Sequence, residues 1–337
     1  MTPFAPARDF LHATLDARFA GPRQWQTATL SLQWLAEGVL ALAPLDAADT
    51  LDHVLLSTGI HGNETAPIEV VNSIVNDLLA GAMPLRCRLL VMLGNPVAMR
   101  SGARFTDYDM NRLFNGAHIS QPQAQEARRA AELEQLAADF FRAAPAGVQR
   151  LHYDLHTAIR GSVFEKFAIY PYTDGRPHKR EQLLWLESAD VSTLLLHSKP
   201  AATFSYYTSH HFHADALTLE LGKARPFGDN DLARFAGIDR ALRRLVSGST
   251  PPLPAYDASR FAVFHAKYDL VKHSEQFKLH LADSVENFTA LPHGMTIAED
   301  GDIRYVADGG EERILFPNPK VGIGLRAGIV ISPCQLD

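Results

Sequence analysis

His61 and Glu64 are the first residues whose types and spacing could hold a metal ion. They lie in the segment LDHVLLSTGIHGNE (51–64), where a short apolar run leads into a turn. Gly59 and Gly62 bracket the histidine, so the backbone there can take angles that other residues avoid. An imidazole nitrogen and a carboxylate oxygen are ordinary zinc ligands. The pair alone has a simpler explanation, a surface histidine and a glutamate facing a helix N-terminus.

His156 would supply a third ligand. It follows the short apolar strand LHYDL (151–155), and open α/β sheets place their ligands at the carboxyl ends of strands. Three protein ligands leave the fourth position of a tetrahedral zinc site to water. Asp154 would share a strand face with His156 and could orient its ring. Taken singly, His156 has a simpler explanation as a buried histidine bonded to a neighbouring backbone carbonyl.

Glu220 is a candidate general base. It is the fifth of six residues in the apolar strand ALTLEL (216–221), where a carboxylate is costly unless it is paired or functional. A base that activates a metal-bound water must be held at such a strand end. The alternatives are a glutamate that reaches solvent or one paired with Lys223 or Arg225.

The polar segment from Val97 to Gly116 is expected to be a long loop, and long loops in compact domains are often functional. It carries Arg104, Asn111 and Arg112. Arginine grips a carboxylate with two hydrogen bonds, and asparagine adds donors. Arg104 could also polarise a scissile carbonyl. The alternative is a solvated basic loop whose arginines pair with its own aspartates, Asp107 and Asp109.

Arg160 and a histidine-rich segment are two further candidates. Arg160, shortly after His156, is a candidate clamp for a substrate carboxylate. His210, His211 and His213 resemble a metal cluster, but we do not expect them to be ligands. The first site already has three ligands, and histidines on exposed loops are common.

The elements that must position these residues alternate between strands and helices. A short helix and strands are expected over 9–45, followed by apolar strands near 51–60, 86–93, 151–155, 163–170, 192–197 and 216–221. Helical spacing covers 66–79, 122–144, 176–187 and 229–246. Asn63 or Thr65 is expected to cap the first of these helices, with Pro67 in its first turn. This alternation predicts an α/β fold whose largely parallel sheet is covered on both sides.

The composition changes at Gly248, where a proline-rich linker begins. Beyond it, short alternating runs separated by turn residues predict a small all-β domain. We therefore expect a catalytic domain over residues 1–248 and a C-terminal β-domain over residues 249–337.

Composition excludes some classes of function. The chain has 337 residues, a net charge of −6, 46% hydrophobic and 21% charged residues, as in a globular protein. The mild acidity argues against a nucleic-acid partner, which would require a basic excess. The two cysteines, Cys87 and Cys334, are too few for a disulfide framework or a thiolate zinc site. We find no apolar signal core and no segment long enough to span a membrane, so a cytoplasmic protein is expected. The oligomeric state stays open.

Four motifs in this order, GIHGNET, RFTDYDMNRLF, YDLHTAIRGS and TLELGKARPFG, resemble the succinylglutamate desuccinylase/aspartoacylase family of zinc amidohydrolases. The resemblance covers nearly the whole chain, and the last two motifs are most similar to the desuccinylase branch. It implies a zinc-carboxypeptidase-like α/β/α core with a mixed, largely parallel sheet and a C-terminal all-β domain. It also implies one Zn²⁺ per chain.

Carried over position by position, the resemblance implies the zinc ligands His61, Glu64 and His156. It makes Glu220 the general base and Arg104 the residue that polarises the scissile carbonyl. Asn111 and Arg112 match the pair that binds a substrate carboxylate. Aspartoacylases carry a further substrate-binding arginine shortly before the catalytic glutamate, and His210 stands at that position here.

The resemblance therefore implies hydrolysis of N-succinyl-L-glutamate to succinate and L-glutamate, in arginine catabolism by succinylation. The expected partner is a small-molecule N-acyl amino acid, with Arg160 available for the succinyl carboxylate. One alternative is another deacylase of acyl amino acids, aspartoacylase-like, or a carboxypeptidase acting on peptides. Another is a catalytically silent binding protein on the same scaffold. That reading predicts the loss of a ligand or of the base, whereas this sequence has all four residues.

Overall fold

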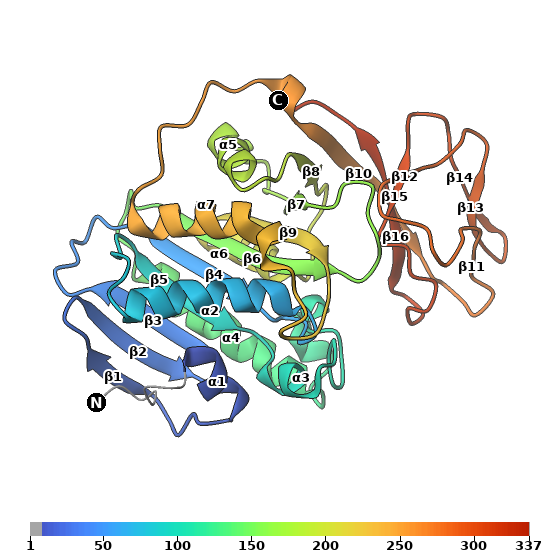
Figure 1. Cartoon of the computed structure of the whole chain (residues 1–337). Helices are drawn as coiled ribbons and strands as arrows, with labels where there is room; N and C mark the ends of the chain where they lie inside the picture. The colour runs from blue at the N-terminus through green and yellow to red at the C-terminus, as the bar shows by residue number, and fades with distance from the viewer. Residues whose placement is uncertain (1–8, 337) are drawn as a thin grey trace.

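The computed structural model describes residues 9–336 and shows a large twisted sheet with helices on both sides, continued by a strand-rich C-terminal part (Figure 1). The main sheet has 13 strands in the order β1-β2-β3-β5-β4-β6-β9-β7-β8-β10-β16-β15-β12. No helix in this described part of the chain is long and apolar enough to cross a membrane.

The centre of the sheet is parallel, as predicted. Its strands are β5 (Arg88–Leu93), β4 (His53–Thr58), β6 (Arg150–Ala158) and β9 (Asp215–Lys223). Strands β7 (Phe167–Tyr170) and β8 (Thr193–Leu196) follow, and β7 runs antiparallel to β9. The N-terminal edge is an antiparallel meander of β1 (Arg23–Gln26), β2 (Leu30–Ala36) and β3 (Val39–Pro44). A mixed, largely parallel sheet is therefore confirmed for the catalytic part.

Helices cover both faces of this sheet (Figure 1). One side carries α1 (Phe10–Leu15), α2 (Thr65–Leu79), α5 (Arg180–Ser188) and α7 (Ala236–Ser247). The other side carries α4 (Gln125–Arg142) and α6 (Phe204–Phe212). Alternate residues of one strand enter the two cores: Leu56 packs with the α2 side, whereas Leu55 packs with the α4 side. Buried on both faces, β4 contains an unbroken apolar run over residues 54–56, which is why its sequence predicts a strand inside a layered fold.

Helix α2 buries the apolar face that the sequence predicts, but its N-cap is a different residue from the one predicted. Ile68, Val71, Ile74, Val75 and Leu78 are all buried, as their helical spacing predicted. The N-cap is Glu64, without a side-chain capping bond, so the prediction of a cap at Asn63 or Thr65 was wrong. The hydroxyl of Thr65 donates instead to the carbonyl of Arg225 at 2.6 Å. Glu64 instead directs its side chain toward His61, His156 and Arg104.

Two segments expected as loops contain helices. The stretch 97–116 holds most of α3 (Pro96–Ser101) and the 3₁₀ turn η1 (Met110–Arg112). Asn95 caps α3 by accepting from the Ala98 N–H, and Pro96 occupies its first turn. His210 and His211 lie on α6 rather than on a loop. The buried part of α6 includes polar Ser205, Thr208 and Ser209, so its sequence shows no apolar stripe.

The C-terminal part is rich in strands, as predicted, and it extends the main sheet. Strand β10 (Ala262–Val271) pairs in parallel with β8 and antiparallel with β16 (Arg326–Pro333). Short strands β15 (Arg313–Leu315) and β12 (Thr289–Ala290) complete that edge. A second sheet contains β11 (Lys278–Leu279), β13 (Thr296–Asp300) and β14 (Ile303–Val306). The division at residue 248 stays a prediction, because backbone pairing continues from one side of it to the other.

Candidate metal centre

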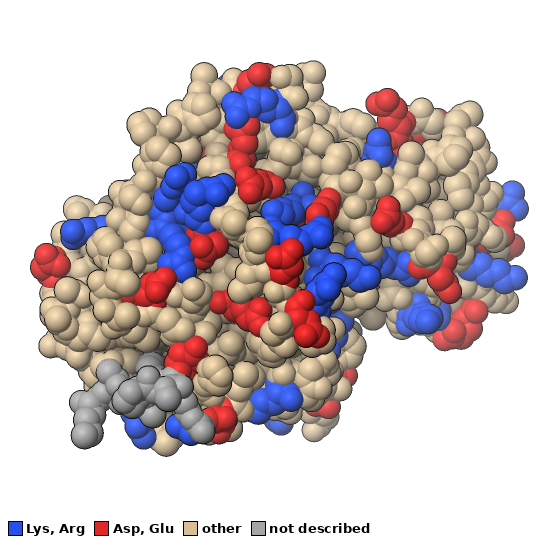
Figure 2. Space-filling model, in the orientation of Figure 1, with Lys and Arg blue, Asp and Glu red and all other residues tan. Residues whose placement is uncertain are grey.

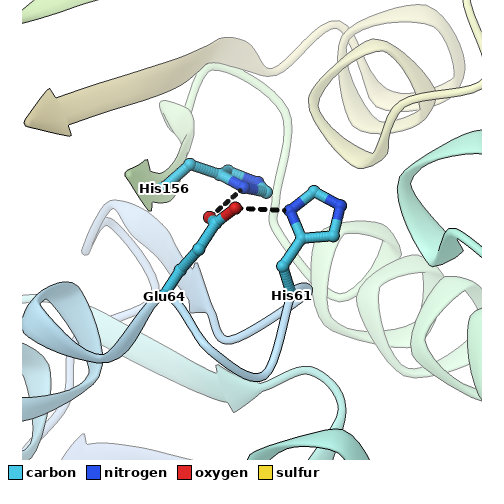
Figure 3. Close-up of side chains that lie close together, drawn as sticks. All are labelled: His61, Glu64 and His156. Carbon is cyan, nitrogen blue, oxygen red and sulfur yellow. Dashed lines mark hydrogen bonds and ion pairs between the residues drawn. The ribbon is translucent and has the colours of Figure 1, made fainter. Parts of the chain in front are cut away.

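His61, Glu64 and His156 converge at the carboxyl ends of β4 and β6 (Figure 3). The Glu64 carboxylate lies between the two rings: Oε1 is 2.9 Å from His61 Nδ1, and Oε2 is 2.9 Å from His156 Nδ1. Each residue offers one ligand atom, and these three atoms lie within 4.8 Å of one another. All three residues are at most 3% exposed. The structure thus brings together the three residues that the sequence predicted as ligands.

The turn that carries His61 depends on close packing. Gly59 has φ 66°, in the left-handed region that favours glycine. A Cβ at Gly62 would lie 2.2 Å from the carbonyl carbon of Ala98, so only glycine fits against α3 there. The Gly62 N–H donates to the carbonyl of Arg104 at 3.1 Å. The turn is therefore held against the segment that contributes the arginines of the site.

Each histidine turns its second nitrogen toward an aspartate. His61 Nε2 lies 2.9 Å from Asp109 Oδ1, and His156 Nε2 lies 3.1 Å from Asp154 Oδ2. A carboxylate at Nε2 favours the tautomer that protonates Nε2 and leaves Nδ1 free to bind a metal. Asp154 occupies the place predicted for it. Asp109 was considered only as an ion-pair partner of the loop arginines, and nothing in its sequence context indicates contact with His61.

The charges around the three ligands favour a cation. Burial favours neutral His156, but the carboxylates of Asp154 and Glu64 outweigh it and raise its pKa well above the ordinary value. Burial would also raise the pKa of Glu64, yet the two histidines hold it well below its usual range. His61 Nδ1 is buried, and its described neighbour is the Glu64 oxygen 2.9 Å away, another of the three ligand atoms. Two imidazole nitrogens and a carboxylate oxygen that converge in a buried position fit a bound metal ion.

Glu220 lies beside the three ligands on the neighbouring strand. It pairs in register with His156 across β6 and β9, and it is 8% exposed. Burial raises the pKa of Glu220 to about 7, and the charge of Glu64 acts in the same direction. Its Oε2 is buried without a hydrogen-bond partner among the described residues. No described ion pair joins it to Lys223 or Arg225, so neither of the paired alternatives is observed.

The predicted loop residues also reach the centre. Arg104 Nη1 donates to Glu64 Oε1 at 2.7 Å, and its Nη2 is 3.9 Å from Asp109 Oδ2. Arg112 Nε lies 3.5 Å from the same Asp109 oxygen. The Asn111 N–H donates to Asp109 Oδ1 at 3.1 Å, while its side-chain oxygen is buried without a partner among the described residues. Asp109 thus links both arginines to His61.

Arg160 and His210 are engaged elsewhere. Arg160 Nη1 donates to the backbone carbonyls of Asp283 and Val285, in the C-terminal part of the chain. His210 is 41% exposed at its side chain and lies 2.9 Å from Asp174 through Nδ1. Among residues 9–336, the group that could hold a metal ion is His61, Glu64 and His156, and it does not include His210, His211 or His213.

Arg326, at the start of β16, is a charged neighbour that the sequence did not indicate. Its Nη1 lies 3.3 Å from His197 Nε2 and 3.8 Å from Asp269 Oδ1. Burial lowers the pKa of Arg326, Asp269 opposes that shift, and the positive charge of Arg112 adds to it. The C-terminal part thus places a cation near the loop arginines. Such a long-range approach has no local sequence pattern.

Comparison with known proteins agrees with this geometry. The sequence model of the succinylglutamate desuccinylase/aspartoacylase catalytic domain matches residues 50–246, and that of the AstE/AspA barrel-sandwich hybrid domain matches residues 259–334. The chain belongs to the succinylglutamate desuccinylase/aspartoacylase family. The family resemblance of the four motifs is thereby confirmed.

Within this family, the chain is 63% identical over 308 residues to a succinylglutamate desuccinylase of Chromobacterium violaceum, covering 91% of each chain. It is 51% identical to a relative of the same name from Burkholderia lata, covering 95% of this chain and 89% of the relative. The crystal structure of the succinylglutamate desuccinylase from Chromobacterium violaceum superposes with a TM-score of 0.88 at 56% identity, covering 99% of both chains. Murine aminoacylase 3, at 16% identity, shares the fold with a TM-score of 0.56, covering 86% of this chain and 97% of its own.

Proposed function

We propose that this chain hydrolyses N-succinyl-L-glutamate to succinate and L-glutamate, with one Zn²⁺ held by His61, Glu64 and His156. The observation that carries the proposal is the convergence of these residues with Glu220, in a chain so similar to succinylglutamate desuccinylases. Two imidazoles and one carboxylate are a common ligand set of catalytic zinc, which leaves a position for water.

Bound zinc would act as a Lewis acid and bring the pKa of its water toward neutrality. Glu220, whose pKa of about 7 suits proton transfer near neutral pH, takes a proton from the attacking water. It then delivers that proton to the leaving amine. Arg104 stabilises the negative charge that develops on the amide oxygen.

Asn111 and Arg112 would orient a carboxylate of the substrate. The side-chain amide of Asn111 has two hydrogens that it can donate to a carboxylate, and Arg112 lies 3.5 Å from Asp109. On the face shown in Figure 2, Lys and Arg side chains gather between α7 and the C-terminal strands, with carboxylates among them. At the metal centre itself, Arg104 and Arg112 supply positive charge that suits a substrate with three carboxylates. We further propose that the reaction belongs to arginine catabolism by succinylation, as the family resemblance implies, and that it takes place in the cytoplasm.

Specificity for the acyl group provides the test. We expect kcat/KM for N-succinylglutamate to exceed that for N-acetylaspartate by a wide margin, because His210 replaces the arginine of aspartoacylases. A panel of N-acyl amino acids assayed with the zinc-loaded protein measures this preference. A preference for N-acetylaspartate would indicate an aspartoacylase-like deacylase. Absence of hydrolysis across the panel would favour a silent binding protein.

Arg160→Ala belongs in the same panel. If Arg160 binds the succinyl carboxylate, the variant loses activity on succinyl substrates and keeps its slower activity on acetyl substrates. The carbonyls of Asp283 and Val285 supply a competing explanation, in which Arg160 joins two parts of the chain. Equal losses on both acyl groups would support that explanation and remove Arg160 from the substrate site.

A further inference from the structure

The segment 104–112, here called the arginine loop, brings four site residues to the metal centre. These residues are Arg104, Asp109, Asn111 and Arg112. The loop contains only the 3₁₀ turn η1 as regular structure. Irregular backbone of this kind is mobile unless other contacts fix it, so its hydrogen bonds must be found elsewhere.

Glu126, in the first turn of α4, fixes the middle of this loop. Its Oε1 accepts from the Thr106 N–H at 2.6 Å, from the Thr106 hydroxyl at 2.7 Å and from the Asn95 side-chain amide at 3.2 Å. Its Oε2 accepts from the N–H groups of Asp107 at 3.1 Å and Tyr108 at 3.2 Å. The carboxylate thus collects five donors, three of them from consecutive backbone amides.

The attachment is reciprocal. Helix α4 begins after Ala124, whose side chain makes no capping bond. Asp107 Oδ2 accepts from the Gln125 N–H at 2.8 Å and supplies that cap from the arginine loop. Loop and helix start therefore fix one another through two carboxylates.

The contacts of Glu126 require an ionised carboxylate. The residue is 1% exposed, and no ion pair of Glu126 occurs within residues 9–336. Burial would raise its pKa, but the Thr106 and Asn95 hydrogen bonds outweigh it and lower the value. In a glutamine at this position, the side-chain nitrogen would carry two hydrogens and face N–H groups that are themselves donors. Glutamine therefore cannot reproduce the five hydrogen bonds.

We propose that Glu126 is a positioning residue of the reaction: it holds residues 106–108 and thereby sets where Arg104 meets Glu64 and where Asp109 meets His61. Arg104 precedes the held segment by two residues, and Asp109 follows it directly. A displacement of the held segment is therefore passed to both contacts. The catalytic consequence rests on the proposed function, whereas the effect on the loop does not.

Glu134 provides a matched control on the same helix. It is also buried, and it accepts from the Gly116 N–H at 3.3 Å, outside the arginine loop. Both glutamates would be replaced by glutamine, which keeps size and removes charge. A general weakening of α4 would affect both variants, whereas a role in positioning concerns Glu126 alone.

Hydrogen–deuterium exchange and kinetics on the zinc-loaded full-length protein test the proposal. In Glu126→Gln, we expect faster exchange in peptides covering 104–112 with little change in the central strands. We expect kcat/KM to fall on the order of 10- to 100-fold, with KM raised through Arg112 and kcat lowered through Arg104. Glu126→Asp should recover part of this loss. Glu134→Gln should keep both the loop exchange and kcat/KM of the wild type.

Unchanged exchange of the arginine loop in Glu126→Gln would overturn the proposal, and so would equal losses of activity in the two glutamine variants. If Glu126→Gln does not fold, Thr106→Ala removes a single donor and should show a smaller increase in the same peptides. Wild-type loop exchange in Thr106→Ala would then overturn the proposal. Should the wild type fail to hydrolyse N-succinylglutamate, the proposed function fails, while the exchange comparison still decides whether Glu126 holds the loop.

Discussion

Two buried glutamates at the centre differ in their preferred charge. Glu64 lies between His61 and His156, and these rings hold its pKa well below the usual range in spite of burial. Burial raises the pKa of Glu220 to about 7 together with the charge of Glu64, although the charge of His156 acts in the opposite direction. Environments that separate the pKa values of two carboxylates separate their roles. An ionised Glu64 suits a metal ligand, and Glu220 suits a base that gains and loses a proton.

The two roles predict different losses in two variants. Glu220→Gln should keep its metal and its fold and lose on the order of 10²–10⁴-fold in kcat, because the base is removed.

His156→Ala should lose zinc and activity together, because two remaining ligands hold zinc weakly. Metal content by atomic emission and kcat are measured on the same preparations, with the exposed His280→Ala as control.

Full zinc content in His156→Ala would contradict the ligand assignment. Near-normal turnover in Glu220→Gln would show that Glu220 is a structural residue at a strand end. The two assignments can therefore fail independently.

At the scale of elements, the site residues that could be predicted from the sequence are those at the ends of strands. His61, Glu64 and His156 could be predicted because apolar runs locate strand ends, and parallel neighbours bring those ends together. The contact of Asp109 with His61 could not be predicted, because it depends on the fold of the arginine loop. That fold depends in turn on Glu126 of α4. Helix α6 also escaped prediction, since buried Ser205 pairs with Thr218 and buried Thr208 with His152. Buried polar contacts between distant segments leave no periodic pattern in a sequence.

Helices α1 and α2 are joined by Asp9, which makes their packing sensitive to pH. Asp9 caps α1 by accepting from the His12 N–H at 2.9 Å, and its other oxygen accepts from Asn72 at 2.7 Å and Asn76 at 3.0 Å. Burial would raise its pKa, but these bonds lower it from 3.8 to about 2. A depressed pKa stabilises the fold above the unfolded-state value, and this contribution is lost as the pH falls from about 4 through about 2.

Asp9→Asn should therefore reduce stability at pH 7 by about 1 kcal/mol, because the amide caps the helix but cannot accept from both asparagines as well. Between pH 4 and pH 2, the variant should lose less stability than the wild type. Urea denaturation across this range measures both effects, with Asp49→Asn as control because the Asp49 side chain is 92% exposed. Parallel pH curves for wild type and Asp9→Asn would rule out this contribution.

At the scale of the whole molecule, the main sheet crosses the predicted domain boundary. Strand β8 pairs with β10 over four residue positions, from Thr193 with Ala262 to Leu196 with His265. A shared apolar cluster also spans the boundary, and its buried members include Phe167, Leu195, Phe264, Phe288 and Ile331. The composition change at Gly248 located a linker, but pairing between distant strands has no local signal. Residues 1–248 alone would expose the β8 edge and one side of this cluster.

We therefore expect residues 1–248 to be unable to fold alone. The covalent connection through the linker, in contrast, should not be needed for folding. A protein cut in the exposed linker, with residues 249–337 supplied as a second chain, should assemble and keep most of its activity, because every contact across the boundary is retained. Residues 1–248 alone should be insoluble or lack a cooperative urea transition, since an unpaired strand edge and an exposed apolar cluster favour aggregation. Sedimentation and urea denaturation distinguish the two preparations. A soluble, cooperatively unfolding 1–248 fragment would show instead that the catalytic part is an independent folding unit to which the C-terminal strands are only attached.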